Sequence, residues 1–281
     1  MGEGDPLAAR WDGEEDCQPL RRTVHPVFGE VALLRNAAGD GLVLVKERSF
    51  ASRKAAEAEV RALRARAAAN HPALMRLLGC SAAAQRQLCA SSYTVKAFYE
   101  HWPVTLQAEV EQRLRRGAAF APAEARALCF TVLEALRTLH ARGVAHGDVR
   151  PQTVAFDVAS GAFRLLERLD DAGDFERVQA RHVQQKRAMY VSPQLWRRLR
   201  GARGAAVSPE RNDLFALGLT VLVAATVTPV GDIYEPQGGL LLDRLAAHLA
   251  RFAAQCAEEA DLVVLVRALL TEREEDRPDP L

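Results

Sequence analysis

Three features of the sequence predict an α+β fold built in two parts. Strand-like apolar runs lie within residues 27–98, and helical periodicity dominates the chain after Trp102-Pro103. The 281 residues are 49% hydrophobic, which is enough for a substantial core. We therefore expect a small β-rich part over residues 22–102 and a larger helical part over residues 103–281.

The chain begins with a segment of different character. Residues 1–21 are acidic and Gly-rich and show no periodicity, so we expect a flexible tail there. Apolar runs at residues 27–35 and 42–47 then flank the turn-rich residues 36–41. This arrangement is typical of a β-hairpin.

A helix and two further strands complete the predicted N-terminal part. Residues 52–69 are rich in Ala, Arg and Glu, carry Val60 and Leu63 on one helical face, and end before Asn70-His71-Pro72. Residues 74–80 and 88–98 are again strand-like. The predicted order is strand, strand, helix, strand, strand.

The C-terminal part opens with a long helix. Pro122 suits a first helical turn, Gly143 suits a helix stop, and residues 123–142 between them carry apolar residues at helical spacing, namely Leu128, Val132, Leu136 and Leu139. Residues 154–157 and 162–166 then predict a small hairpin, and residues 168–189 a polar loop. We expect the remainder to be helical.

Composition excludes several classes of function. Lys and Arg total 37 against 36 Asp and Glu, so the chain has no field that would attract nucleic acid or an anionic membrane. The 5 cysteines form no C-x-x-C pair, which argues against a zinc site and a disulfide framework and favours a reducing, cytoplasmic location. The apolar run 214–230 contains Thr, Gly and Pro, so we expect a buried core helix rather than a membrane span.

The most informative segment is His146-Gly147-Asp148-Val149-Arg150-Pro151-Gln152-Thr153. It resembles the catalytic loop H-R-D-L-x-x-x-N of the protein-kinase family, with Asp148 at the Asp position and Thr153 at the Asn position. In the N-terminal part, Phe28-Gly29-Glu30-Val31 resembles the end of the Gly-rich loop, Leu44-Val45-Lys46 the end of V-A-I-K, and Glu59 the acidic residue of helix C.

Further landmarks of protein kinases follow in the family's order. Ser192-Pro193-Gln194 resembles A-P-E, Asp213 to Gly218 resembles the D-x-W-x-x-G helix, and Arg277-Pro278 lies near the end. The resemblance covers roughly residues 24–280 and implies a bilobal Ser/Thr protein-kinase fold. It also implies that Asp213 accepts backbone N–H bonds from the catalytic loop, so Asp213→Ala should destabilise the protein more than Asp148→Ala.

The resemblance assigns roles to individual residues. Lys46 would hold the α- and β-phosphates of ATP, Glu59 would orient Lys46, and Asp148 would accept the proton of a substrate hydroxyl. The nucleotide site would be formed by residues from both lobes, namely Gly29, Val31, Lys46, Thr153 and Glu167.

The metal-binding positions depart from the kinase pattern. Thr153 has a single hydroxyl where kinases use Asn, and the D-F-G position falls on Glu167-Arg168-Leu169. An alternative alignment uses Asp171-Ala172-Gly173, but it places charged residues in a buried strand, so we favour Glu167. These replacements argue against a Mg²⁺ site.

The phosphate-gripping and regulatory positions are altered as well. Val24 and Pro26 stand where the earlier glycines of the Gly-rich loop belong, and Leu44 replaces the small Ala that leaves room above adenine. Gly147 replaces the Arg that binds activation-loop phosphate, and residues 168–191 contain no Ser or Thr. A phosphothreonine switch is therefore not expected.

These departures favour a pseudokinase that presents a surface to a protein partner. Two alternatives stay open: an atypical active Ser/Thr kinase with Glu167 or Asp171 on Mg²⁺, and a sensor that binds ATP without metal. Metal-dependent ATP binding distinguishes the first from the second. The basic segment 196–203, with its single Trp196, is either a solvated loop or a docking site for an acidic or phosphorylated segment. Because the chain ends soon after Arg277-Pro278, we also expect the last kinase helix to be missing and an apolar groove to be exposed.

Overall fold

The computed structural model describes residues 6–25, 28–36, 41–68, 71–86, 91–167, 190–202, 207–235 and 239–279. The chain divides into two compact units, Met1–Trp102 and Pro103–Leu281. The first unit is built on a β-sheet and the second is mainly helical, so the predicted α+β class is confirmed.

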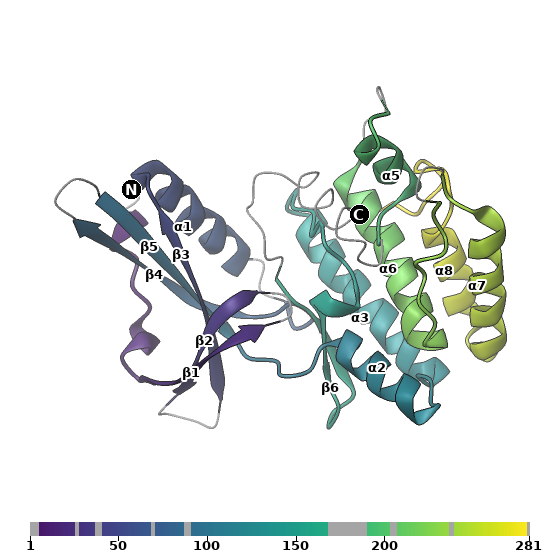
Figure 1. Ribbon diagram of the computed structural model, residues 1–281, viewed down its shortest axis with the longest axis horizontal. Coiled ribbons are helices and arrows are strands. Elements are labelled where there is room, and N and C mark those ends of the chain that lie inside the picture. Colours follow the sequence, from purple (N-terminus) through teal and green to yellow (C-terminus); the bar gives the residue numbers. More distant parts are fainter. Residues whose placement is uncertain are drawn as a thin grey trace. The chain divides into compact units, whose positions relative to one another are not determined.

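Unit 1 is an antiparallel sheet with one long helix (Figure 1). The strands run in the order β1-β2-β3-β5-β4 and are β1 (Cys17–His25), β2 (Gly29–Asn36), β3 (Leu42–Phe50), β4 (Leu77–Arg86) and β5 (Ser91–Glu100). Helix α1 (Arg53–Ala67) follows β3 and buries Ala56, Val60 and Leu63 while contacting β3, β4 and β5.

Strand β3 is buried on both faces over Val43 to Val45, which explains the apolar run there. Val43 and Val45 pack with Phe98 and Trp11 on one face, which we call the Trp11 face. Because side chains alternate along a strand, Leu44 and Lys46 lie on the opposite face, which we call the Lys46 face. Leu44 is fully buried there, opposite Tyr99 of β5.

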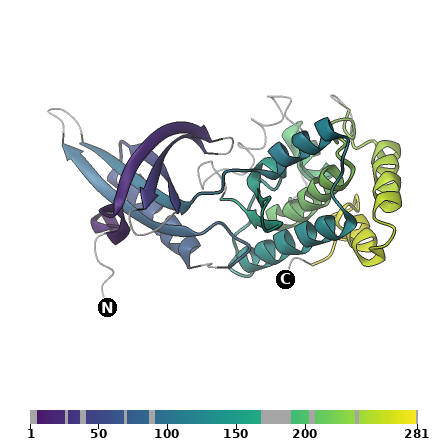
Figure 2. The ribbon, with the colours of Figure 1, turned by 90° about the horizontal axis from the view of Figure 1, so that it is seen from below.

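The prediction of a flexible tail through residue 21 is wrong for residues 6–21. Residues 6–16, which we call the strap, lie along the sheet before the chain enters β1 (Figure 2). The N–H of Ala82 in β4 donates to the carbonyl of Ala9 (2.9 Å), and the Trp11 ring centroid lies 4.6 Å from that of Phe98. Gly79 makes room for the strap, since a Cβ there would lie 2.4 Å from Trp11.

Strand β1 was missed because it is mostly exposed. Only His25 of its residues is buried, so the hydrophobic alternation that indicates a strand is absent. Pro19 is tolerated because β1 is an edge strand with an irregularity between Pro19 and Arg21.

Unit 2 is organised around α6 (Pro209–Thr226), which contacts α3, α7 and α8 (Figure 1). The other helices are α2 (Leu106–Arg116), α3 (Pro122–His140), α5 (Pro193–Leu199), α7 (Leu242–Gln255) and α8 (Ala260–Leu269), and η3 (Pro151–Thr153) is a short 3₁₀ turn. The predicted hairpin is confirmed as β6 (Val154–Asp157) paired with β7 (Ala162–Leu165). Every residue of α6 from Asn212 to Ala225 is buried, which matches the predicted core helix. No described helix is long and apolar enough to cross a membrane.

Candidate functional site

The catalytic-loop segment of unit 2 is held by one buried carboxylate. Asp213 has no exposed surface, and its Oδ2 and Oδ1 accept the backbone N–H groups of His146 and Gly147, both at 2.7 Å. His140 Nε2 lies 3.0 Å from the same Oδ2. The predicted contact of Asp213 with the loop is confirmed. Asp213 lies one turn inside α6, which is capped by Ser208.

His146 joins the loop to the end of the β6–β7 hairpin. Its Nε2 lies 2.7 Å from the Leu166 carbonyl, and its Nδ1 accepts the N–H of Asp148 at 3.2 Å. This pattern fits a neutral imidazole with the proton on Nε2. Gly147 between them has φ +77°, a left-handed conformation that a glycine adopts without strain.

The carboxylate of Asp148, the predicted proton acceptor, is engaged by Arg150. Arg150 Nη2 donates to Asp148 Oδ2 at 3.2 Å, and Nε lies 2.8 Å from Oδ1 in an ion pair whose angle is too bent for a hydrogen bond. Both side chains are buried, at 5% and 7% exposure for Asp148 and Arg150. Sequence reasoning missed Arg150, although it lies inside the segment that was singled out.

Thr153 does not point a free hydroxyl toward a metal site. Its Oγ1 donates toward the carbonyls of Asp148 (2.5 Å) and Arg150 (3.0 Å) and accepts the N–H of Arg150 at 3.0 Å. The side chain is fully buried. One hydroxyl has a single proton and two lone pairs, so its main hydrogen-bonding capacity is used inside its own loop.

Glu167, the favoured D-F-G position, lies two residues after the end of β7 at Leu165. The preceding Leu166 is bound to the loop on both sides, because its N–H donates to the Thr153 carbonyl (2.8 Å) and its carbonyl meets His146. Glu167 itself is partly buried. The alternative Asp171 lies outside the described residues.

In unit 1 the predicted pair of Lys46 and Glu59 is not formed. Within the described residues, Glu59 on α1 binds Arg48, with Arg48 Nη1 2.8 Å from Glu59 Oε1. Arg48 lies on the same face of β3 as Lys46, one alternation further along the strand. The Arg48 guanidinium therefore binds the carboxylate that the kinase pattern assigns to Lys46. The sequence signal for this pairing was a second basic residue on the same face of the strand.

The tip of the β1–β2 hairpin contains Gly29, predicted as the last glycine of the phosphate loop. Gly29 has φ +65° and pairs with His25, and a Cβ on it would meet nothing within 4 Å. Phe28 before it is 5% exposed, and its N–H donates to His25 Nδ1 at 3.3 Å. Val31 is buried at 4% exposure, and Pro26 lies outside the described residues.

Aromatic rings gather at this tip on the Lys46 face. The Phe28 ring stacks on Tyr99 with centroids 5.6 Å apart, meets the His25 ring at 4.9 Å, and lies 5.9 Å from Lys46 Nζ. Burial of the imidazole, followed by the charge of His101, lowers the pKa of His25 to about 4. His25 is therefore neutral at pH 7 and can accept the Phe28 N–H.

The segment resembling A-P-E retains its structural contact without its charge. Gln194 Oε1 accepts from Arg277 Nη2 at 2.6 Å, and Arg277 also donates from Nε to the Thr271 carbonyl at 2.9 Å. Burial lowers the pKa of Arg277 to about 10. Trp196 is 2% exposed and stacks on Tyr234, so the aromatic residue of the expected basic docking segment is part of the core.

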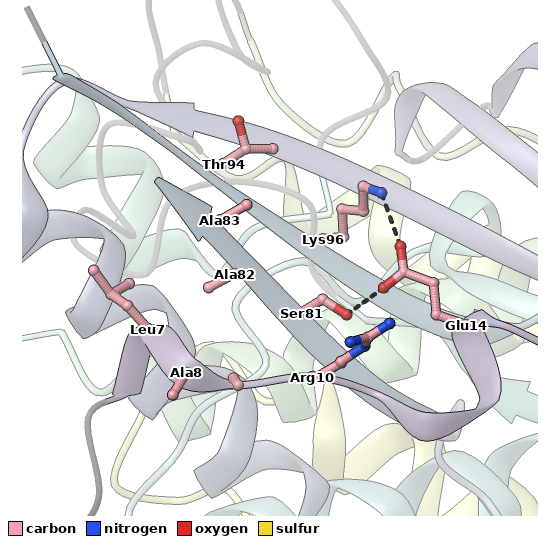
Figure 3. A pocket seen from close by; sticks show the side chains of 10 residues that line it. Leu7, Ala8, Arg10, Glu14, Ser81, Ala82, Ala83, Thr94 and Lys96 are labelled. Atoms are coloured by element: carbon pink, nitrogen blue, oxygen red, sulfur yellow. Dashed lines mark hydrogen bonds and ion pairs between the residues drawn. The ribbon is translucent and has the colours of Figure 1, made fainter. Parts of the chain in front are cut away.

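A cavity of about 390 Å³ lies under the strap of unit 1 (Figure 3). Small apolar residues line one end, namely Leu7, Ala8, Ala9, Ala82 and Ala83. At the other end Glu14 accepts hydrogen bonds from Ser81 Oγ (2.6 Å) and Lys96 Nζ (2.8 Å). Since Lys96 is compensated by Glu14, this cavity is poorly suited to nucleotide phosphates and is separate from the kinase-like residues.

No group of three His, Cys, Asp or Glu residues that could hold a metal ion is found in the described part of the chain. Asp148 and Glu167, which the kinase pattern would place near Mg²⁺, are described residues and belong to no such group.

Comparison with known proteins supports the fold assignment. No protein-family model matches the chain. The glycogen synthase kinase-3 homolog YGK3 of Saccharomyces cerevisiae is 31% identical over 77 residues, which cover 26% of this chain and 20% of that protein. A crystal structure of Rad53 1-466 in complex with AMP-PNP matches 94% of this chain and 63% of that chain, with a TM-score of 0.59 and 16% identity. The chain has a protein-kinase fold.

Both comparisons are partial. The chain covers about a fifth of the length of the curated relative and less than two thirds of the Rad53 chain. The kinase fold agrees with the architecture described above, in which a β-rich lobe with one long helix precedes a helical lobe.

Proposed function

We propose that this protein is a pseudokinase that acts by binding a protein partner rather than by transferring phosphate. One observation carries the proposal: the Thr153 hydroxyl is fully buried and bonded to its own loop. Kinases place an Asn at this position to bind Mg²⁺, and Mg²⁺ requires oxygen ligands at short, nearly octahedral geometry. Thr153 would have to give up its hydrogen bonds within the loop to supply an oxygen ligand.

The state of Asp148 supports the same proposal. A catalytic base must reach the substrate hydroxyl, but the Asp148 carboxylate is paired with Arg150 in a buried ion pair.

The test is a phosphoryl-transfer assay with purified protein, ATP and Mg²⁺. We expect no transfer to the protein itself or to a generic protein substrate. Transfer that is lost in Asp148→Ala would overturn the proposal and establish an atypical active kinase. Thr153→Asn serves as a matched variant, because restoring the Asn alone should not create activity while Asp148 remains paired with Arg150.

Nucleotide sensing is the second candidate function, favoured by the retention of Lys46 on β3. The Rad53 structure contains AMP-PNP, so ATP is the appropriate ligand to test. A ligand that binds the folded state raises its stability by mass action. A thermal shift with ATP that does not depend on Mg²⁺ supports sensing, and no shift supports a scaffold.

The proposed partner surface includes three exposed arginines, namely Arg197 and Arg198 of α5 and Arg200 at its C-terminal cap. Arg200 lies 4.9 Å from the buried Trp196 ring, so the core holds the basic segment in place. An acidic or phosphorylated protein segment suits this surface. A cytoplasmic location completes the proposal, and the free thiols of Cys17, Cys80, Cys129 and Cys256 are consistent with it.

A further inference from the structure

The cavity under the strap has two chemically different ends (Figure 3). Its volume of about 390 Å³ is typical of small-molecule sites in proteins. What we call the apolar end is formed by aliphatic residues of the strap and of β4, namely Leu7, Ala8, Ala9, Ala82 and Ala83. What we call the polar end is formed by Arg10, Glu14, Ser81 and Lys96. An apolar pocket with a few polar groups at one end favours an amphipathic ligand.

The strap holds the cavity open without a ligand. The N–H of Ala82 donates to the carbonyl of Ala9 at 2.9 Å, and Ser81 Oγ accepts the backbone N–H of Trp11 at 3.3 Å. The Trp11 ring packs on Phe98. Because these contacts fix the strap on the sheet, a ligand can bind without the entropic cost of ordering it.

The polar end carries charges of both signs close together. Glu14 Oε1 accepts from Lys96 Nζ at 2.8 Å, and Arg10 is paired with Glu15 beside the cavity. The side chains of Lys96 and Glu14 are 40% and 28% exposed, so a ligand can reach them. An ammonium and a guanidinium have several N–H donors, and a carboxylate accepts several hydrogen bonds, so each group can take a further partner.

This mixture of charges selects the kind of ligand. A ligand with one sign of charge is disfavoured, since an anion meets the Glu14 carboxylate and a cation meets the Lys96 ammonium. A zwitterion satisfies both signs at once, with its cationic group on Glu14 and its anionic group on Lys96 and Arg10. The apolar end then requires an aliphatic group directly beside these two charges.

We propose that the cavity under the strap binds a free aliphatic α-amino acid. Its ammonium and carboxylate groups contact the polar end, and its side chain packs against the alanines of the apolar end. The α-amino acid suits the site because one carbon atom carries both charged groups and the aliphatic side chain. The proposal does not depend on the pseudokinase function, because none of the residues that line the cavity belongs to a segment that resembles a kinase motif.

The test is isothermal titration calorimetry of the full chain with L-leucine and with two analogues that each lack one charge. Isocaproate lacks the ammonium group of leucine, and isoamylamine lacks its carboxylate. We expect L-leucine to bind about tenfold or more tightly than either analogue. No binding of L-leucine, or equal affinity for L-leucine and one analogue, would overturn the proposal.

A pair of variants in β4 tests the apolar end. Ala83→Leu should abolish the binding of L-leucine, because the larger side chain fills this end of the cavity. Ala84→Leu is the matched control, since Ala84 is equally exposed on β4 but points to the opposite face of the sheet and does not line the cavity. It should bind L-leucine as tightly as the unmodified protein. Undiminished binding in Ala83→Leu would contradict the proposed location.

A variant of Glu14 tests the polar end and decides the matter if Ala83→Leu does not fold. Glu14→Gln keeps the size of the side chain but removes the charge that faces the ligand ammonium. It should weaken the binding of L-leucine about tenfold and should not weaken that of isocaproate. Unchanged affinity for L-leucine would overturn the proposal. L-leucine has no phosphate to transfer, so these outcomes are independent of the assay that tests the proposed function.

Discussion

The catalytic-loop segment of unit 2 and the hairpin tip of unit 1 both resemble kinase elements that handle ATP, but they are stabilised differently. The loop is held from outside, by a buried carboxylate of α6 that accepts N–H groups from His146 and Gly147. The tip is held by its own hairpin and by β5, through the His25 bond and the stacking of Phe28 on Tyr99.

The difference shows which kinase features persist without kinase chemistry. We expect the loss of Asp213 to destabilise the fold, because it would leave buried N–H donors without acceptors. Thr153 and Arg150 replace catalytic contacts with hydrogen bonds and an ion pair inside the loop. At the tip, aromatic stacking and the hydrogen bond to His25 hold Phe28 at the place where a phosphate-binding loop would bind an anion.

The largest expected effect tests the outside support of the catalytic loop. Asp213→Asn should destabilise the protein by about 3 kcal/mol, because the amide nitrogen cannot accept the N–H that one of the two oxygens now accepts. Asp148→Asn keeps an acceptor for Arg150 and should cost about 1 kcal/mol. Denaturant melts of both variants provide the measurement. A larger loss of stability in Asp148→Asn than in Asp213→Asn would contradict the view that Asp213 stabilises the loop while Asp148 only occupies the catalytic position.

The second prediction tests the hairpin tip through its pH dependence. The pKa of His25 is about 4 in the folded protein, below its ordinary value, so the unfolded chain binds the proton first as the pH falls. The contribution of His25 is complete above about pH 6.5 and is lost progressively down to about pH 4, by roughly 3 kcal/mol.

The measurement is the free energy of unfolding at a series of pH values. His25→Asn should reduce the dependence of this free energy on pH between about pH 4 and pH 6.5. Burial also lowers the pKa of His101, which contributes a slope of the same sign. His101→Asn is therefore the control, and a profile that His25→Asn leaves unchanged would show that the tip does not depend on a neutral imidazole.

The third prediction concerns the Trp11 face, which the strap covers. Gly79→Ala should destabilise the protein by about 1–2 kcal/mol, because the new Cβ would lie 2.4 Å from Trp11 and displace it. Gly41 lies just before β3, a Cβ on it would meet nothing within 4 Å, and Gly41→Ala should be nearly neutral. Thermal melts and near-ultraviolet circular dichroism compare the two. Equal melting temperatures of Gly79→Ala and Gly41→Ala would mean that the strap adds no stability to unit 1.

The smallest prediction has the opposite sign. Gln194→Glu should stabilise unit 2 by about 0.5–1 kcal/mol, because it gives the buried Arg277 an opposite charge. The gain is reduced because the Gln194 Nε2 bond to the Glu272 carbonyl (2.6 Å) is lost. Gln194→Met removes both contacts and should be destabilising in the same melt. A neutral Gln194→Glu would indicate that Arg277 is already compensated by the carbonyls around it.

Local chemistry determined much of unit 2 from the sequence alone. Pro122 begins α3, and the apolar residues of 154–157 and 162–165 form the hairpin. These features depend on residues close in sequence, whereas the contact between the loop and α6 through Asp213 was predicted from the resemblance to protein kinases. The departures at Thr153 and Gly147 were visible in the same way.

Tertiary structure alone decided the features of unit 1 that matter most for function. The strap looked like a tail because its order depends on one Trp ring packing against Phe98 and on space left by Gly79. Glu59 pairs with Arg48 rather than Lys46, and Phe28 stacks on Tyr99. Both contacts depend on which side chains of separate strands and of α1 meet on one face of the sheet. Composition does not encode such long-range contacts, because they form between residues distant in the chain only when the sheet brings them together.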